Sequence, residues 1–556
     1  MHQPARHPLN ATKSFARMAQ RWFNDIVFDL ARQFRWSYLP PLMVYLAAGI
    51  SGLTAIVGTF FIKDYLGLSA AFLAGLSFWV GLPWALKMPL GHLVDLIWRW
   101  KSLLVYLGAL IIGLSILIMY GLIAHTDTMA AIMNIEAWFI ASALMAPTGY
   151  VLQDVVADAM TVEAVPLVDD AGKPFSEGRI KAMHTTMQTL GRFAIISGSV
   201  AVALLNVVMF SGVETMSEAA KAAIYANIYL LALLIPLISI IGVALGTVLL
   251  RRRAAKMREQ GVDEARIETI LFQPAGPTAP NWWILGGSAV FVVFTLGMGF
   301  SEIPLAQEII FIGSMVIIVF LMRRLLAELA PDTQRALVGT AIIIFVFRAV
   351  PLPGPGATWF EIDVLDFDQR FLSILSLIAS GLALAGMVVL RPLMARNTIA
   401  WLVALLTIAA GILSLPNIGL YYGLHEWTSS WSNGIIDARF IAVIDTTLES
   451  PLGQVAMIPM LAWIAKNAPV HLKATFFAVM ASFTNLALSA SSLFTRYMNE
   501  VFTITREVRD RASDTVIVTA DYRELGWLLI AVSLIGVLLP LATIYIVQRS
   551  PLRTSE

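Results

Sequence analysis

Two things are scarce in this chain. Cysteine is absent, and Asp, Glu, Lys and Arg together make up only 13% of the 556 residues. Without cysteine the chain cannot form a disulfide, an iron–sulfur cluster or a cysteine-ligated zinc site. Soluble proteins are nearer a quarter charged, so the low charge argues against a soluble globular chain. The net charge of +1 gives no reason to expect nucleic acid as a partner.

Enzyme motifs are missing as well. No hydrophilic segment is long enough for a separate catalytic or nucleotide-binding domain. The text nearest to a phosphate-binding loop, 172-GKP-174, lacks the first glycine of that motif and its Ser/Thr. There is no HExxH metal motif and no nucleophile elbow. We therefore expect no enzyme activity, no cofactor and no ATP-driven transport within this chain.

Apolar residues are abundant instead, and they come in long blocks. The chain is 58% hydrophobic, with a mean hydropathy of +0.77. Blocks of roughly 20 residues have the length of a helix that crosses a hydrocarbon core of about 30 Å. Backbone groups in lipid must be satisfied within the protein, so these blocks should be helices. We predict an all-α polytopic membrane protein with about 14 transmembrane helices.

The blocks fall into three groups. The first six lie near residues 40–62, 70–89, 102–124, 130–152, 185–209 and 223–250. A central pair lies near 282–300 and 304–322. The last six lie near 336–352, 370–390, 398–416, 438–464, 473–498 and 525–547. This grouping predicts two six-helix halves plus a central helix pair.

The grouping divides the chain into six parts. Residues 1–38 should be a cytoplasmic segment with an amphipathic helix at 14–36, which either lies on the membrane surface or packs on the ends of the bundle. The other parts are the N-terminal half 39–250, a cytoplasmic basic linker 251–281, the central pair with its linker 282–335, the C-terminal half 336–548 and a cytoplasmic tail 549–556.

Basic residues indicate the orientation. With the N-terminus inside, the predicted inner loops are rich in Lys and Arg, and the predicted outer loops are poorer, apart from the mixed-charge stretch 500–524. The inner residues include Arg99, Lys101, Lys173, Arg179, Arg251 to Arg253, Arg323, Arg324 and Arg549. We expect both termini in the cytoplasm and the chain in a bacterial inner (plasma) membrane.

Two segments of the chain repeat each other. The stretch 60-FFIKDYLGLSAAFL-73 aligns with 359-WFEIDVLDFDQRFL-372, and the identical residues share one constant offset. Each segment links the first and second spans of a six-span half. An even number of spans separates the copies, so both halves face the same way. A parallel repeat of this kind is expected of the major facilitator architecture, with a binding site between the halves.

The loop after the second span, 91-GHLVDLIWRWKS-102, is similar to the loop motif of the major facilitator superfamily. Gly91 would let two helices approach closely, and Asp95 could cap a helix or pair with Arg99 or Lys101. Such a cluster would act as a gate on the cytoplasmic side. The alternative is an ordinary charged loop.

Several longer stretches resemble the folate–biopterin transporter family of that superfamily. They are LKMPLGHLVD, GYVLQDVVADAMTVEAVP, FRAVPLPGPGATWFEIDVLDFDQRFLSIL, and PLGQVAMIPMLAWIAKNAP followed by ATFFAVMASFTNLALS. They cover both halves. The central pair, the long loop 500–524 and the Ala-Val-Pro after Glu163 depart from the family pattern. The resemblance implies a secondary transporter of a folate- or pterin-like solute.

The fourth span ends in carboxylates. Asp154 and Asp158 are four residues apart and share a helix face, whereas Glu163 points elsewhere. On the fifth span, His184, Gln188 and Arg192 form a polar stripe, from which Arg192 could pair with either aspartate. Two interpretations stay open. The residues bind substrate or couple a proton, or they form a structural cytoplasmic gate with Arg99, Lys101 or Arg179.

The second half has its own polar side chains. Asp445 and Glu449 are also four apart, and Gln454 follows on the same span. Glu449 should lie near the middle of the membrane, where a charge is costly, so these residues are candidates for substrate binding or coupling. Arg348 either snorkels to the interface or forms an outer gate with Glu361 or Asp363.

The sequence thus predicts a secondary active transporter that moves a small organic solute by alternating access and is coupled to a proton or cation. Its partners would be the solute, the coupling ion and the lipid bilayer, with no nucleic acid; the oligomeric state stays open. The alternative is a non-transporting scaffold, an assembly or pigment-delivery factor, or a sensor on the same fold.

Overall fold

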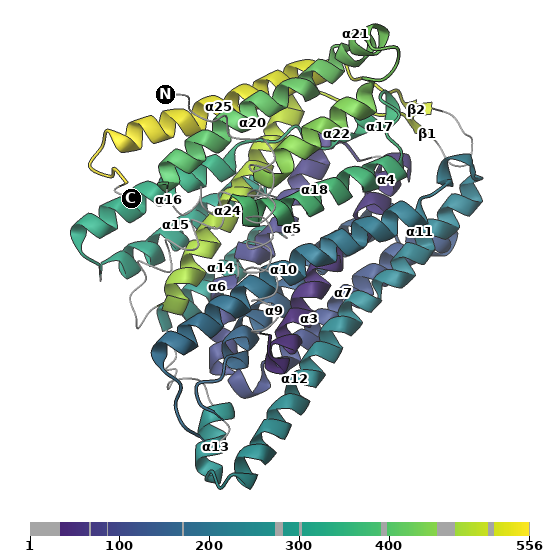
Figure 1. The fold of residues 1–556 in the computed structure, drawn as a ribbon. Coiled ribbons are helices and arrows are strands. Elements are labelled where there is room, and N and C mark those ends of the chain that lie inside the picture. Colours follow the sequence, from purple (N-terminus) through teal and green to yellow (C-terminus); the bar gives the residue numbers. More distant parts are fainter. Residues whose placement is uncertain are drawn as a thin grey trace, which may run out of the picture.

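In the computed structural model the chain is an elongated bundle of helices with one small β-hairpin (Figure 1). The structure describes residues 34–65, 68–85, 87–169, 172–272, 282–299, 303–327, 329–390, 397–452, 473–509 and 516–554. The expected amphipathic helix at 14–36 and Gln454 lie outside these ranges, apart from residues 34–36.

The N-terminal half contains the first six spans. Its helices are α3 (Leu39–Ile50), α4 (Ala55–Tyr65), α5 (Ala70–Ala85), α6 (Lys87–Leu96), α7 (Ser102–Ala124), α8 (Thr126–Ile132), α9 (Ile135–Ala164), α10 (Glu177–Met209), α11 (Glu218–Ala232) and α12 (Leu234–Glu259). Short 3-10 turns lie at Trp36–Tyr38, Ser51–Thr54, Trp98–Trp100 and Val213–Thr215.

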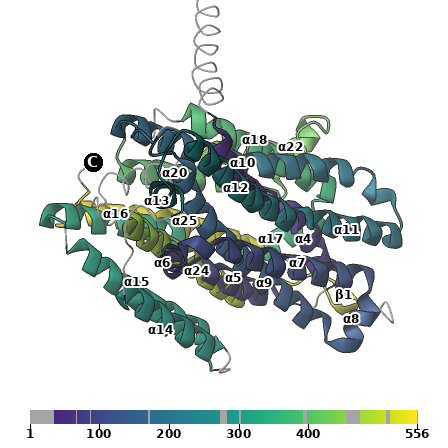
Figure 2. The same cartoon turned by 90° about the horizontal axis from the view of Figure 1, so that it is seen from below.

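A short helix and the central pair follow. They are α13 (Glu264–Leu271), α14 (Trp282–Gly299) and α15 (Ala306–Leu326). Figure 2 shows α14 and α15 side by side at the edge of the bundle. The pair packs on α6 and on α24 (Lys473–Val501) of the C-terminal half. It is therefore an addition to one side of the two-half core.

The C-terminal half contains the remaining spans. Besides α24, its elements are α16 (Pro331–Ala349), α17 (Pro355–Asp363), α18 (Gln369–Val389), α20 (Ile399–Tyr421), α21 (Leu424–Trp431), α22 (Ala438–Glu449), a 3-10 turn at Ser450–Leu452, β1 (Val508–Arg509), β2 (Val516–Val518) and α25 (Leu525–Gln548). The two strands pair antiparallel within the stretch expected to be an outer loop.

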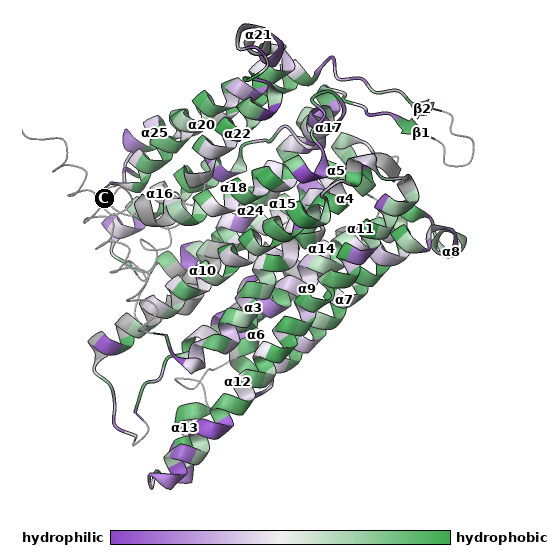
Figure 3. Cartoon of the chain, turned by 45° about the vertical axis from the view of Figure 1, so that its right-hand side comes forward, coloured by the Kyte–Doolittle hydropathy of each residue, from purple (hydrophilic) through white to green (hydrophobic). Residues whose placement is uncertain are grey.

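We call the end of the bundle that bears β1, β2 and α17 the hairpin end, and the end that bears α13 the linker end (Figure 1). In Figure 3, apolar residues run along most of the long helices, and hydrophilic residues gather at α13. Nine stretches of the described residues are long and apolar enough to cross a membrane. The chain is therefore an integral membrane protein.

The packing shows the duplication directly. In the N-terminal half α3 packs on α10 and α12, and in the C-terminal half α16 packs in the same way on α24 and α25. The halves meet through two equivalent pairs, α5 with α24 and α18 with α10. Each pair joins the second span of one half to the fifth span of the other. The predicted fold of two six-helix halves plus a central pair is confirmed.

Equivalent helices also begin alike. The Asn134 side chain caps α9 by accepting a hydrogen bond from the backbone N–H of Ala137 at 2.8 Å. The Asp437 side chain caps α22 in the same way, from Phe440 at 2.8 Å. Asn and Asp are favoured at this position because their side-chain oxygens satisfy free N–H groups of the first turn. Both fourth spans therefore start at the hairpin end with a defined cap.

Two helices continue past the apolar blocks that predicted them. The fourth block ends near residue 152, and α9 continues to Ala164, so it includes the three carboxylates expected at the end of this span. The sixth block ends near residue 250, and α12 continues to Glu259 through the first residues of the predicted basic linker. Charged residues lower the local hydropathy without breaking a helix, so a helix can extend beyond its apolar block. On α12, Arg253 donates a hydrogen bond to the carbonyl of Val168 at 2.8 Å.

A close helix contact within the N-terminal half lies between Gly108 of α7 and Gly149 of α9. A Cβ atom at Gly108 would lie 2.6 Å from the Gly149 carbonyl oxygen, and one at Gly149 would lie 2.7 Å from the Gly108 carbonyl oxygen. Small residues allow this approach in membrane bundles, where packing drives helix association. The position of the α9 carboxylates therefore depends on this contact.

We predict that Gly108→Ala destabilises the protein by about 1–3 kcal/mol, because the added methyl group forces α7 and α9 apart. Gly113→Ala is the matched control, since it lies on the same helix and its Cβ would meet no atom within 4 Å. Thermal unfolding of the purified variants in detergent measures the difference. Equal melting temperatures for the two variants would contradict this packing.

Candidate functional site

The centre of the candidate site is one lysine between two aspartates. Lys87, the first residue of α6, places Nζ 2.6 Å from Oδ2 of Asp154 and 2.8 Å from Oδ2 of Asp158. Both aspartates lie on α9, one turn apart, so a single ammonium group reaches both. This contact joins the second span to the fourth.

Further polar groups surround the two carboxylates. The hydroxyl of Tyr45 on α3 donates a hydrogen bond to Oδ1 of Asp158 at 2.6 Å. Arg192 on α10 is exposed and lies within electrostatic range of Asp154. We name Lys87, Asp154, Asp158, Tyr45 and Arg192 the lysine–aspartate cluster. It contains groups from four helices of the N-terminal half.

Exposure differs within the cluster. The Asp154 side chain is 16% exposed and the Lys87 side chain 24%, whereas the Asp158 side chain is 48% exposed. Asp158 is therefore the carboxylate that a proton or a solute reaches most easily. Asp154 lies about 28 Å along α9 from its first residue, which places the cluster toward the linker end.

The expected partner of these aspartates was Arg192, and the structure corrects this. The ion pairs are formed by Lys87, and Arg192 makes no ion pair with any described residue. Lys87 begins its helix beside α9, so its ammonium group reaches between the two carboxylates. The side chains of His184 and Gln188 lie outside the described part of the structure.

A second cluster lies at the linker end. Buried Lys101 pairs with Glu163 at 3.1 Å, and its Nζ also lies 4.1 Å from the ring centroid of Trp98. This pair joins the start of α7 to the end of α9, so it lies within one half. Arg99 is exposed and lies 4.0 Å from Glu268 of α13. Neither pair connects the two halves.

Gly91 does not play the expected packing role. A Cβ atom at Gly91 would meet no atom within 4 Å, so this glycine is not needed for close helix approach. The Asp95 side chain lies outside the described part of the structure. Of the four residues of the loop motif, Lys101 is the one that makes a close ion pair with a described residue.

The C-terminal half places its carboxylates differently. Asp445 on α22 is buried and accepts a hydrogen bond from Nδ2 of Asn417 on α20 at 3.0 Å. Glu361 on α17 and Glu449 both lie within electrostatic range of it. Asp445 is about 10 Å along α22 from its first residue, so this group lies nearer the hairpin end than the lysine–aspartate cluster does. Glu449 is exposed and ends α22.

The halves are linked by an ion pair at the hairpin end. Nζ of Lys63 on α4 lies 2.5 Å from Asp363 on α17, and the Tyr522 hydroxyl donates to the same carboxylate at 2.5 Å. Nearby, Gln369 of α18 donates to the Tyr225 hydroxyl of α11 at 2.7 Å. Lys63 and Asp363 lie in the two repeated segments, so the copies of the repeat contact each other. We call this group the hairpin-end latch.

Arg348 is not part of the latch. It was expected to snorkel or to pair with Glu361 or Asp363, but Asp363 pairs with Lys63. Arg348 forms no ion pair with any carboxylate that the structure describes, and its side chain is partly buried in the last turn of α16. The expected pairing of Arg348 with either carboxylate is therefore not seen among the described residues, and its role as an outer gate stays a prediction.

The central pair is fastened to both halves near the hairpin end. On α15, Gln307 donates to the carbonyl of Gly75 on α5 at 3.2 Å and accepts from Arg496 of α24 at 3.2 Å. The Tyr497 hydroxyl of α24 donates to Glu308 of α15. Since α5 and α24 are the pair through which the halves meet, α15 braces that contact.

Comparison with known proteins agrees with this geometry. A solved POT family transporter in complex with 5-aminolevulinic acid aligns with 92% of this chain and 95% of its own, with a TM-score of 0.60 at 12% identity. A peptide transporter POT in complex with sulfate aligns with 93% of this chain and 96% of its own, with a TM-score of 0.57 at 16% identity. These similarities show the major facilitator fold.

The fold, together with a match of residues 48–555 to the model of the BT1 family, therefore defines a membrane transporter of the major facilitator type, not an enzyme. This chain belongs to the BT1 family. It is 21% identical over 496 residues to the folate-biopterin transporter of Synechocystis sp. (strain ATCC 27184 / PCC 6803 / Kazusa). That alignment covers 87% of this chain and 79% of the relative. The family resemblance seen in the sequence is confirmed.

We predict that the hairpin-end latch holds the halves together by charge. Asp363→Lys places two ammonium groups side by side and should open this end, whereas adding Lys63→Asp restores an ion pair. Because the chain has no cysteine, a single Ile62→Cys in the cluster between the halves reports opening through its labelling rate. We expect about fivefold faster labelling in Asp363→Lys, since a partly exposed pair contributes roughly 1 kcal/mol.

The double variant Lys63→Asp with Asp363→Lys, which reverses both charges, is the control for this experiment. It should return the labelling rate to that of the chain with Ile62→Cys alone. Equally fast labelling in the single and double reversals would mean that the residues act by size and not by charge.

Proposed function

We propose that this protein is a secondary active transporter that moves a folate- or pterin-like solute by alternating access, coupled to protons through the lysine–aspartate cluster. The observation that supports it is the Lys87 ammonium group bound to two carboxylates, one of them half exposed, in a chain of the BT1 family. Such a cluster can exchange a carboxylate of its own for one from a solute.

The exchange needs one proton. With both aspartates ionised, Lys87 is fully engaged and the cluster has no net positive charge to attract a further anion. When a proton binds Asp158, that carboxyl group loses its charge while Asp154 stays paired. Lys87 and exposed Arg192 then attract an anionic group of the solute. Release of the proton on the other side restores the Asp158 ion pair and expels the solute.

The proposed solute class follows from the relative. The protein from Synechocystis is named a folate-biopterin transporter. Folate has carboxylates that would suit Lys87 and Arg192, and its flat ring could hydrogen-bond polar groups of the other half. In that half, Asp445 offers such a polar group, with Asn417, Glu361 and Glu449 around it. Gln188 and Gln454 remain proposed contributors to the same site.

During alternating access, the two halves would move relative to each other about the two equivalent helix pairs. The pairs α5 with α24 and α18 with α10 let the halves rock, while the hairpin-end latch opens and closes. Lys101 with Glu163 would keep α7 and α9 together during that motion, as a brace within one half. Gating by Gly91, Asp95 and Arg99 is supported only by their place in the loop motif.

We also propose that the linker end faces the cytoplasm of a bacterium, across its inner membrane. Arg253, Arg266 and Lys101 gather at that end. An excess of Lys and Arg is typical of cytoplasmic loops. Both termini would then be cytoplasmic.

Uptake of labelled folate, of a reduced pterin and of unrelated control solutes tests the proposal. It should be measured at two external pH values in cells that express the wild type, Asp158→Asn or Asp169→Asn. We expect wild-type uptake of folate or pterin to rise at the lower pH. Asp158→Asn mimics the protonated state, so its uptake should lose the pH dependence and fall by about 10²-fold, the lower limit for loss of a positioned proton-transfer group.

Asp169→Asn is the matched control, because Asp169 lies in the loop after α9, outside the cluster. It should behave like the wild type. Unchanged pH dependence in Asp158→Asn would contradict the coupling role of this residue. Absence of folate and pterin uptake, with correct membrane insertion, would contradict the solute class.

A further inference from the structure

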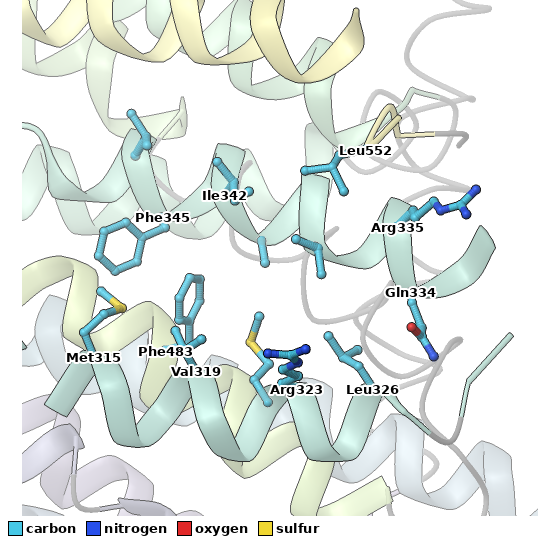
Figure 4. Close-up of a pocket in the computed structure, with 14 residues that line it drawn as sticks. Met315, Val319, Arg323, Leu326, Gln334, Arg335, Ile342, Phe345, Phe483 and Leu552 are labelled. Atoms are coloured by element: carbon cyan, nitrogen blue, oxygen red, sulfur yellow. The ribbon is translucent and has the colours of Figure 1, made fainter. Parts of the chain in front are cut away.

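A crevice that plays no part in the proposed transport lies between the central pair and the C-terminal half. Its volume is about 530 Å³, and it is bounded by α15 on one side and α16 on the other. Phe483 of α24 and Leu552 of the C-terminal tail close it (Figure 4). It is therefore separate from the lysine–aspartate cluster, which lies in the other half.

The crevice is apolar at one end and cationic at the other. Figure 4 shows Met315, Phe345 and Phe483 gathered at one end, while Arg335 and Gln334 lie at the end near Leu552. Arg323 projects from α15 between these ends. The walls thus suit a hydrocarbon chain, and the polar end suits a negatively charged group.

The positive charge of Arg323 and Arg335 is poorly compensated by the residues that the structure describes. Arg323 is exposed and forms no ion pair with any residue in the described ranges. Arg335 lies 3.5 Å from Asp332, and the side chains of this pair are 58% and 97% exposed, so the contact is weak. Two arginines next to an apolar crevice therefore attract an anion that also carries an apolar part.

The dimensions match one leaflet of a bilayer. From Gln334 to Phe345 along α16 is about 16 Å at 1.5 Å per residue. Half of a hydrocarbon core of about 30 Å has nearly the same depth. A lipid chain could run along α16 from the linker end to the middle of the membrane, with its headgroup beside the arginines.

The crevice is also reachable from the side of the bundle. The central pair lies at the edge of the molecule (Figure 2), and Val319, which lines the crevice, is 44% exposed. The C-terminal tail covers the polar end, where the Leu552 carbonyl packs so closely on Gly339 that a Cβ there would lie 1.9 Å from it. Entry is therefore from the lipid side, under the tail.

We propose that this crevice binds an anionic phospholipid of the bilayer, with an acyl chain between α15 and α16 and its phosphate held by Arg323 and Arg335. Basic pockets between transmembrane helices are suited to anionic headgroups, because each arginine near the membrane surface adds attraction. The bound lipid fills the space that the helices leave and ties the central pair to the C-terminal half.

The test uses the full-length protein, purified in detergent and freed of lipid. Phosphatidylglycerol, phosphatidylcholine and inorganic phosphate are titrated separately, and binding is followed by native mass spectrometry and by melting temperature. We expect phosphatidylglycerol to bind and to raise the melting temperature, and the other two to have little effect. Equal effects of both lipids would overturn headgroup recognition, and an effect of inorganic phosphate alone would overturn the role of the acyl chain.

Substitution of the arginines localises the site. In Arg323→Gln with Arg335→Gln, the affinity for phosphatidylglycerol should fall by about 25-fold, since each arginine near a membrane surface contributes roughly fivefold. Arg251→Gln with Arg252→Gln is the control, because these exposed residues of α12 remove the same charge elsewhere. Equal losses in the two double variants would mean that only net charge matters.

Filling the crevice gives an independent test. Val319→Trp should block the acyl chain and abolish the rise in melting temperature with phosphatidylglycerol, while the lipid-free protein keeps its fold because Val319 is half exposed. Val316→Trp is the matched control, since Val316 lies on the same helix, is 63% exposed and does not line the crevice. A full response to phosphatidylglycerol in Val319→Trp would place the lipid elsewhere.

Discussion

The arrangement of charges in this protein is governed by the cost of leaving a charge unpaired inside a membrane protein. Lys87 and the two aspartates of α9 lie in a bundle where water is scarce, and each needs a partner. The structure meets this need with one ammonium group between two carboxylates, so charge is satisfied only while α6 and α9 stay together. A group that must be paired, yet is reachable through half-exposed Asp158, can pass a proton or accept a solute in exchange.

The fold supplies the symmetry that such an exchange needs. Each half repeats the same packing, and the halves touch through two equivalent helix pairs. The charges break this symmetry: the N-terminal half holds its carboxylates near the linker end, and the C-terminal half holds Asp445 nearer the hairpin end. The Lys63–Asp363 pair joins the halves at the hairpin end. The lysine–aspartate cluster and the group around Asp445 therefore lie at different depths along the bundle.

Much of the fold could be predicted because hydropathy and repeats are local properties of a sequence. The spans, the central pair and the parallel duplication follow from blocks of about 20 apolar residues. The residues that pair with the two aspartates could not be predicted from the sequence, because this pairing depends on contacts between helices that are far apart in the chain. Lys87 is 67 residues from Asp154, and Tyr45 is 113 residues from Asp158. A lysine at the end of an apolar block was the one available signal. The β-hairpin was missed because its strands are only a few residues long.

The most direct test of the central claim is the number of protons exchanged when solute binds. Calorimetric titration of the purified transporter with folate, in buffers of different ionisation enthalpy, gives that number for the wild type and for Asp158→Asn. We predict uptake of about one proton per bound solute in the wild type and none in the variant. Equal proton uptake in both proteins would contradict the assignment of Asp158, and binding without proton uptake in the wild type would contradict proton coupling at this cluster.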